Sequence, residues 1–188
     1  MYLSEEIAQE EKALAFYLRH HHTEPLKSEQ LLQDTHGYQE LLTPYFQIQS
    51  QELQKWAEEP YQSNPYFPEQ LIHKSSSGRF VRSKSEAMID HFLYTNRIPY
   101  RYEAPLQLGQ QIIYPDFTIR HPRTGDIYYY EHFGKMDDPA YCKKTAMKIQ
   151  LYSEHGIIPS IHLIMTFESL KHPLTTDTIQ KTIEEYFL

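Results

Sequence analysis

The sequence predicts a mixed α/β domain with the element order helix, three strands, helix, strand, helix, preceded by a helical N-terminal extension. Three observations support this. Apolar runs of strand length, rich in Tyr and Ile, fall between residues 98 and 133. An amphipathic helical pattern precedes them, and a longer one at residues 138–156 follows. Strands joined by short turns pair antiparallel, whereas a strand after a long helix can join in parallel through a right-handed crossover, so we expect a mixed central sheet.

Composition limits the class of protein. The chain has 188 residues and a formal net charge of −7, so it can bury a real core but carries no general basic coat. Cys142 is its single cysteine, which excludes an internal disulfide or a cysteine-based zinc site. No apolar run reaches the ~20 residues that span a bilayer, and the acidic start is unlike a signal peptide. We therefore expect a cytoplasmic protein without a membrane partner.

Residues 1–78 are predicted to form the helical extension and a linker, and residues 79–188 the main domain. Helical patterns occur at residues 1–20, 26–37 and 49–60, the last ended by Pro60. Further prolines follow, and "HKSSSGRFVRSK" at residues 73–84 is interpreted as a flexible basic connector, with the domain boundary near residues 74–80. The predicted helices carry no motif, so capping of the core, partner binding and dimerisation all stay open.

Each element of the main domain has a local signal. Residues 83–97 form the first predicted helix, with Ser83 as its N-cap. A strand interrupted by Pro105 covers residues 98–108, and Gly109 permits a tight turn into a second strand at 110–120. The remaining predicted elements are a turn at 121–126, a strand at 127–133, a helix from Asp138 to Gly156, a buried strand at 159–167 and a helix at 175–187.

Two acids stand out within the strands. Asp116 follows Pro115 in an otherwise apolar run, and Glu131 lies in "IYYYEHF". If the second and third strands pair around their turn, both carboxylates can point to one side of the sheet. Two carboxylates at such a short separation repel each other unless a divalent cation neutralises them. Oxygen ligands of this kind favour Mg²⁺ or Mn²⁺. Such an ion could polarise a phosphate and activate water.

Glu86 on the first helix could supply a third acid. The stretch "SKSE" from Ser83 also fits a capping box in which Glu86 reaches back to the helix start. The two roles do not exclude each other, so both remain open.

Lys148 is the candidate cation. With Tyr141, Thr145 and Tyr152 it forms one stripe of the helix at 138–156, beside expected core positions that include Ala146. A lysine at the edge of the sheet-facing surface could orient water or stabilise developing negative charge. The alternative is an ordinary helix lysine whose stem lies along the core.

A basic run precedes Glu86. It could contact phosphates beside a reacting bond, or it could be a solvated linker. Its members are Lys74, Arg79, Arg82 and Lys84.

The chain resembles the PD-(D/E)XK nuclease superfamily in an ordered set of features: an acid on a helix, "PD" in a hairpin strand, an acid on the next strand, then a helix and a strand. The combination "RSKSE…YPDFTI…EHFG" is also similar to a bacterial subgroup of that superfamily with a helical extension. The resemblance covers about residues 79–170 and implies a restriction-endonuclease-like αβββαβ core that cleaves DNA with Mg²⁺. It assigns Asp116 to the "PD" aspartate, Glu131 to the (D/E) and Glu86 to the first-helix acid, and it implies that all three bind the metal.

One position departs from this pattern. The family places a lysine two residues after the acid, where this chain has Phe133. Some members carry the lysine on the following helix, which would be Lys148. His132 is adjacent in sequence, but strand alternation points it to the opposite face from Glu131. A catalytically inactive module that binds nucleic acid or a partner on the same fold is the alternative.

Overall fold

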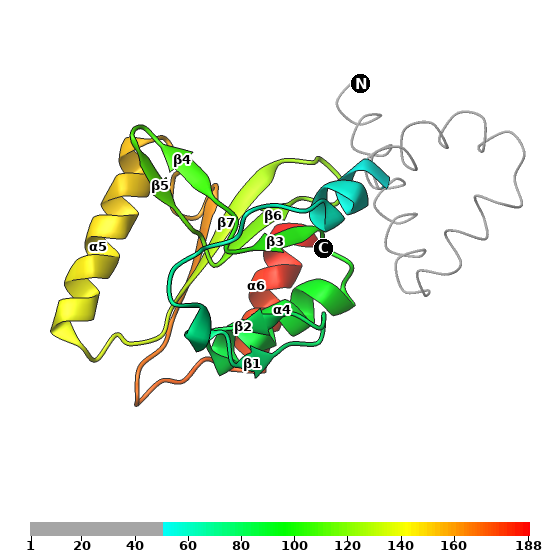
Figure 1. Ribbon diagram of the computed structural model, residues 1–188. Coiled ribbons are helices and arrows are strands. Elements are labelled where there is room, and N and C mark those ends of the chain that lie inside the picture. Colours follow the sequence, from blue (N-terminus) through cyan, green and yellow to red (C-terminus); the bar gives the residue numbers. More distant parts are fainter. Residues whose placement is uncertain (1–50) are drawn as a thin grey trace, which may run out of the picture. The chain divides into compact units, whose positions relative to one another are not determined.

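The computed structural model describes residues 51–188 (Figure 1). Contacts divide the chain between Ile48 and Gln49, so all described residues belong to one compact unit. The helices predicted before residue 49 lie outside the described residues. The helix at 51–58 and the segment after it belong to the same unit as the sheet, whereas the sequence patterns placed the division after residue 78.

The central sheet is mixed. Its order is β3 (Tyr100–Tyr102), β6 (Phe117–Arg120), β7 (Ile127–Phe133) and β8 (Leu163–Phe167). The first three strands pair antiparallel and β8 runs parallel to β7, which confirms the expected mixture of pairings. None of the helices among residues 51–188 is both long and apolar enough to cross a bilayer.

Both long strands predicted before residue 120 are broken. Residues 106–108 leave the central sheet as β4 (Leu106–Leu108) and form a separate hairpin with β5 (Gln111–Ile113) around Gly109, whose φ is 59°. The continuous strand expected over residues 110–120 is therefore wrong at residues 114–116, since Pro115 cannot donate to a strand ladder. Asp116 directly precedes β6 instead of lying inside a strand.

Helices cover both faces of the sheet (Figure 1). On one face, α4 (Lys84–Thr95) and α6 (Thr176–Phe187) pack in the larger apolar cluster, which includes Phe117 and Tyr130 from the strands. On the other face lies α5 (Pro139–Glu154), together with the β4–β5 hairpin, around the buried side chains of Tyr152 and Leu163. Strand alternation thus turns Tyr130 toward α4 and Glu131 toward α5.

The connector predicted at residues 73–84 contains regular secondary structure. β1 (His73–Lys74) and β2 (Phe80–Val81) form a short antiparallel pair, preceded by the 3₁₀ turn η1 (Pro68–Gln70). Val81 is fully buried in the same cluster as Ile89 of α4. Burial of this side chain packs the segment against the domain, where the sequence patterns indicated a flexible connector.

Candidate functional site

The β6–β7 register brings the two strand acids together. The ladder ends at the pair of Phe117 with Tyr130, and Asp116 and Glu131 are the next residues beyond that pair on the two chain segments. Directly opposed residues of an antiparallel pair project to the same side. The backbone N–H of His132 donates to Asp116 Oδ2 at 2.7 Å, which orients this carboxylate at the end of the ladder.

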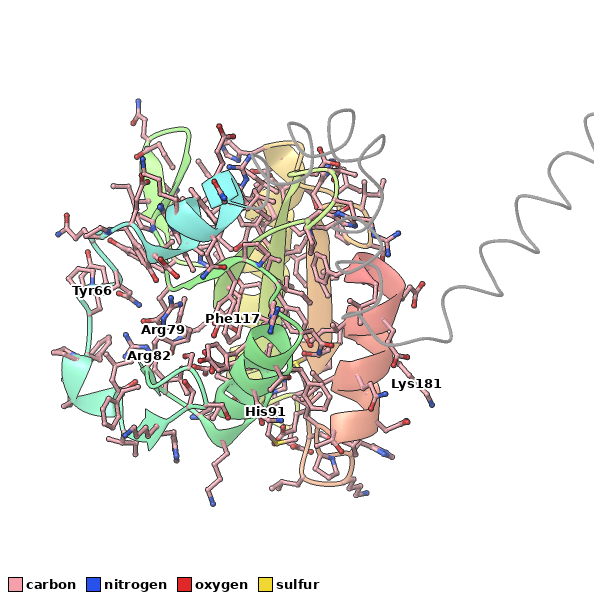
Figure 2. All side chains as sticks on the ribbon, turned by 90° about the vertical axis from the view of Figure 1, so that its right-hand side faces the viewer. Tyr66, Arg79, Arg82, His91, Phe117 and Lys181 are labelled. Atoms are coloured by element: carbon pink, nitrogen blue, oxygen red, sulfur yellow. The ribbon has the colours of Figure 1, made fainter. Side chains whose placement is uncertain are left out.

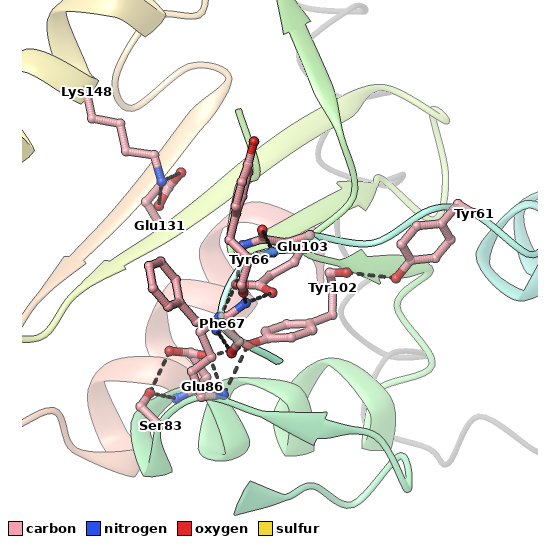
Figure 3. Close-up of polar contacts among 11 residues, drawn as sticks. Tyr61, Tyr66, Phe67, Ser83, Glu86, Tyr102, Glu103, Glu131 and Lys148 are labelled. Atoms are coloured by element: carbon pink, nitrogen blue, oxygen red, sulfur yellow. Dashed lines mark hydrogen bonds and ion pairs between the residues drawn. The ribbon is translucent and has the colours of Figure 1, made fainter. Parts of the chain in front are cut away.

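Glu131 accepts hydrogen bonds from two side chains of α5. Lys148 Nζ lies 2.6 Å from its Oε1 and 2.7 Å from its Oε2 (Figure 3). The Tyr152 hydroxyl donates to Oε1 at 2.5 Å. Glu131 is only 1 % exposed, so these contacts provide the partners that a buried carboxylate requires.

The polar stripe of α5 faces the sheet. Thr145 and Tyr152 are buried, and Tyr141 and Lys148 are half-buried. Ala146, expected among the core positions beside the stripe, is exposed instead. The helix is rotated so that its polar stripe covers Glu131, because a buried carboxylate needs donors more than it needs an apolar cover.

The charges of the cluster shift one another's protonation. Burial raises the pKa of Asp116 well above its usual range, and the neighbouring Glu131 charge raises it further. Burial also raises the pKa of Glu131, although Lys148 and Tyr152 oppose this. For Lys148, burial alone would lower the pKa, but Glu131 and Asp116 outweigh it and the net shift is upward. Lys148 therefore stays protonated at neutral pH.

Glu86 has the capping geometry. Ser83 Oγ accepts from the Glu86 N–H at 3.1 Å, and the Ser83 hydroxyl donates to Glu86 Oε1 at 2.8 Å. Glu86 Oε2 accepts from the Arg82 N–H at 3.1 Å and from the Tyr102 hydroxyl at 2.6 Å. Glu86 nevertheless lies near the strand acids, since its charge contributes to the raised pKa of both.

A three-carboxylate metal cage is not assembled. Within residues 51–188, no three His, Cys, Asp or Glu side chains converge closely enough to hold an ion. Asp116 and Glu131 do fit a hard divalent cation in their chemistry, because such an ion would offset the burial of Asp116 beside the Glu131 charge, both of which raise the pKa of Asp116. Carboxylate oxygens also have about two lone pairs each, so the hydrogen bonds to Glu131 leave capacity for a ligand role.

Arg82 is engaged within the protein. Its Nε and Nη2 lie 2.6 Å and 3.0 Å from the two carboxylate oxygens of Glu103, and its remaining N–H groups donate to the Tyr66 and Phe67 carbonyls. This bidentate pair has most of its surface covered, so the expected contact of Arg82 with phosphate is not what the geometry offers.

The other members of the basic run differ in their surroundings. Lys74 and Lys84 are exposed and free to meet an anion. The Arg79 guanidinium instead lies over the Tyr100 ring, 5.0 Å from its centroid, as a cation–π contact. Arg79 and Arg82 thus have partners within the protein, whereas Lys74 and Lys84 are exposed.

His132 turns away from Glu131, as strand alternation predicts. Its Nδ1 lies 3.0 Å from Thr166 Oγ1, and its Nε2 lies 3.4 Å from Glu168 Oε2. Ser85 of α4 donates to the same oxygen of Glu168 at 2.7 Å. These contacts place His132 in a polar network on the α4 face. Burial lowers the pKa of His132, although Glu168 opposes the shift.

Two site residues had no assigned role in the sequence patterns. Tyr152 was recognisable as part of the α5 stripe, but its hydroxyl contact to Glu131 depends on how the helix lies on the sheet. Glu103 carried no signal, because its partner Arg82 is distant along the chain and either residue alone reads as a surface charge.

Comparison with known protein families, curated proteins and solved structures gave no significant match.

Proposed function

We propose that this chain is a metal-dependent nuclease that hydrolyses DNA phosphodiester bonds, with Mg²⁺ or Mn²⁺ as its cofactor. The observation that supports this most is the contact of Lys148 with Glu131, whose charges both act on the neighbouring Asp116. The order of α4, the central-sheet strands and α5, with the β4–β5 hairpin inserted between β3 and β6, supports the αβββαβ core that the resemblance implies.

In this proposal Asp116 and Glu131 hold the metal ion. The ion would polarise the scissile phosphate and lower the pKa of an attacking water. Glu86 acts from α4 by adding negative charge near the two acids and by holding the Tyr102 hydroxyl. It is a positioning residue in this scheme, because among residues 51–188 Glu86 does not converge with Asp116 and Glu131 closely enough to share an ion.

Lys148 acts as a cation. Its raised pKa keeps it protonated, so it donates hydrogen bonds to a phosphate oxygen or to the attacking water and does not act as the base. The water oxygen forms a bond to phosphorus as the bond to the 3′ or 5′ oxygen breaks in line. The water proton passes to solvent, and the leaving oxygen gains a proton from solvent.

Phe133 explains why the lysine would come from a helix. It occupies the position where the family pattern has lysine, but its side chain is buried and stacks on Phe167 with ring centroids 5.5 Å apart. A lysine there would bury its charge beside an aromatic ring. Lys148 reaches Glu131 from α5 instead, which suits a migrated lysine.

A second function is a binding module without catalysis. Lys148 and Tyr152 together satisfy both oxygens of Glu131, and a carboxylate so satisfied is stable without a metal ion. This module would bind nucleic acid or a partner and leave the strand intact.

Incubation with plasmid and linear DNA tests the two functions against each other. The nuclease predicts cleavage that requires Mg²⁺ or Mn²⁺, is stopped by EDTA, and is lost in Asp116→Asn and Glu131→Gln. The variant Asp126→Asn, altered at an exposed turn acid, serves as the matched control and should cleave normally. DNA binding with no cleavage under any metal would favour the second function, and cleavage unchanged in Asp116→Asn would remove the assignment of the site.

A further inference from the structure

Two neighbouring aromatic side chains beside the candidate site are unusually exposed. Tyr66 is 63 % and Phe67 is 62 % exposed, and both precede the η1 turn. Large aromatic side chains normally bury most of their surface. A pair left open to solvent therefore needs a physical reason, and the surrounding contacts provide one.

The backbone that carries these rings is held firmly. We call residues 64–67 the aromatic strap. Arg82 donates to the carbonyls of Tyr66 and Phe67 at 2.7 Å and 2.8 Å, while the Tyr66 N–H donates to Asn64 Oδ1 at 3.0 Å. Asn64 also donates to Glu103 through its backbone N–H and its side chain. A fixed backbone that carries solvent-exposed rings is expected of a preorganised binding surface. The conformational entropy of the backbone is then already lost on folding and not on binding of the ligand.

Phe67 is held in a strained conformation. Its backbone angles, φ 54° and ψ 54°, lie in the left-handed region that bulky residues rarely adopt. Such residues persist where the surrounding structure over-determines them, and they cluster at ligand-binding and active sites. The Phe67 ring is mostly exposed, so burial of apolar surface does not offset the strain of this backbone conformation.

The strap is connected to the candidate catalytic acids. The Tyr66 ring packs edge-on against Tyr114, with centroids 6.2 Å apart, and Tyr114 lies two residues before Asp116. Glu103, which anchors the strap, donates its backbone N–H to the Asp116 carbonyl at 3.1 Å. In Figure 3 the rings of Tyr66 and Phe67 point away from α4, and Figure 2 places Tyr66 at the periphery with Arg82 on its inner side.

We propose that the aromatic strap stacks on unpaired nucleobases, so that the substrate class of this site is single-stranded or locally unpaired DNA. Exposed aromatic faces bind bases that have left the duplex stack and are sequence-tolerant, since every base has a π-face. The flat faces of paired bases are covered by their neighbours and are not accessible to such a platform. This inference rests on the proposed nuclease function, because it takes the strand phosphate to lie at Asp116, Glu131 and Lys148.

Equilibrium binding in EDTA tests the strap without cleavage. The probes are fluorescein-labelled oligothymidine, an abasic strand of equal length, and a duplex of equal length. The wild-type protein should bind oligothymidine about tenfold more tightly than the abasic strand, which carries the same charge without bases. Tyr66→Ala should abolish most of that preference and leave binding of the abasic strand unchanged.

Two further variants separate stacking from folding. Phe67→Asn introduces a residue that tolerates the left-handed backbone conformation, so this variant should fold normally. It should nevertheless lose the preference for bases, because the aromatic ring is gone. Phe80→Ala removes an aromatic side chain of similar exposure, 53 %, outside the strap and should keep the preference. Equal binding of oligothymidine and abasic strand by the wild type, or an intact preference in Tyr66→Ala and Phe67→Asn, would overturn the inference.

The cleavage assay keeps the two proposals distinct. Failure of the nuclease proposal appears as absent metal-dependent cleavage or as cleavage indifferent to Asp116→Asn. Failure of the base-stacking proposal would appear in the EDTA binding experiment, where no cleavage occurs. Cleavage in the presence of metal would then still depend on Asp116 and Glu131.

Discussion

At the scale of the residue, Lys148 decides what the site can do. Glu131 is buried in the sheet, and a buried carboxylate without a partner would be costly. Lys148 and Tyr152 provide that partnership, and the lysine remains charged as a result. The same contact serves stability and positions a cation beside Asp116, so the two roles must be separated by experiment.

Removal of the lysine charge should slow cleavage, and it should also lower stability because Glu131 would keep only Tyr152 as a side-chain partner. We expect Lys148→Met, which keeps the apolar stem, to lower kcat by about 10²–10³-fold, the effect of deleting one charge-stabilising donor. Lys144→Met, one turn earlier and exposed, is the matched control and should cleave normally. Equal rates for both variants in a plasmid assay would show that Lys148 is only structural.

Asp116 should make stability depend on pH. Its pKa is raised in the folded state, so folding favours the protonated form. The contribution of Asp116 to stability is fully present below its unfolded pKa, near 4, and is lost as the pH rises through the higher folded value. Asp116→Asn avoids that loss, so it should melt above the wild type at pH 8.

Thermal unfolding measures this directly. A gain of about 1 kcal/mol would raise the Tm of a chain of this size by roughly 2–4 °C. The difference between Asp116→Asn and the wild type should shrink toward pH 4, where the aspartate gains its proton. A constant difference at both pH values would contradict the raised pKa.

At the scale of the element, the strap and the start of α4 depend on one ion pair. Arg82 joins the carbonyls of the strap to Glu103, and its backbone N–H also binds Glu86. Segments far apart in the sequence are thereby held beside the end of β3. The loss of one partner would leave a mostly buried charge without compensation.

We expect Arg82→Met to lower the free energy of unfolding by about 3 kcal/mol, because Glu103 would remain buried and unpaired. The double variant Arg82→Met with Glu103→Leu should recover part of that loss. Urea unfolding measures both. Lys181→Ala breaks an exposed ion pair with Asp177 and should leave stability unchanged. A similar effect for Arg82→Met and Lys181→Ala would show that the Arg82 pair does not organise the segment.

At the scale of the whole molecule, the sheet unit extends further toward the N-terminus than sequence patterns suggest. Arg101 of β3 lies over the Trp56 and Tyr61 rings, 4.6 Å and 5.0 Å from their centroids. The Tyr61 hydroxyl also donates to the Tyr102 carbonyl at 2.8 Å. The helix at 51–58 and the strap therefore belong to the folding unit that carries the site.

A fragment that starts at residue 49 should fold, whereas one that starts at residue 79 should not. The longer fragment keeps the contacts of Trp56, Tyr61 and the strap, and the shorter one loses all of them. Circular dichroism and thermal unfolding would show a cooperative transition only for the longer fragment. Cooperative unfolding of residues 79–188 alone would place the domain boundary where the sequence patterns put it.

The amino-acid sequence alone specifies the order of the central-sheet strands and of α4, α5 and α6, together with the caps of these helices. Ser83 and Asp138 cap α4 and α5, because a polar side chain at the right offset satisfies free backbone N–H groups locally. The pairing of β6 with β7, and with it the approach of Asp116 to Glu131, also follows from a short turn and strand alternation.

Only the tertiary structure decided the rest. The rotation of α5 that places Lys148 and Tyr152 on Glu131, the capture of Arg82 by Glu103 and the exposure of the aromatic strap all join residues far apart along the chain. A charged side chain gives the same sequence pattern whether it is solvated or paired with another charge. Its partner is chosen by which surfaces the packed sheet and helices bring together.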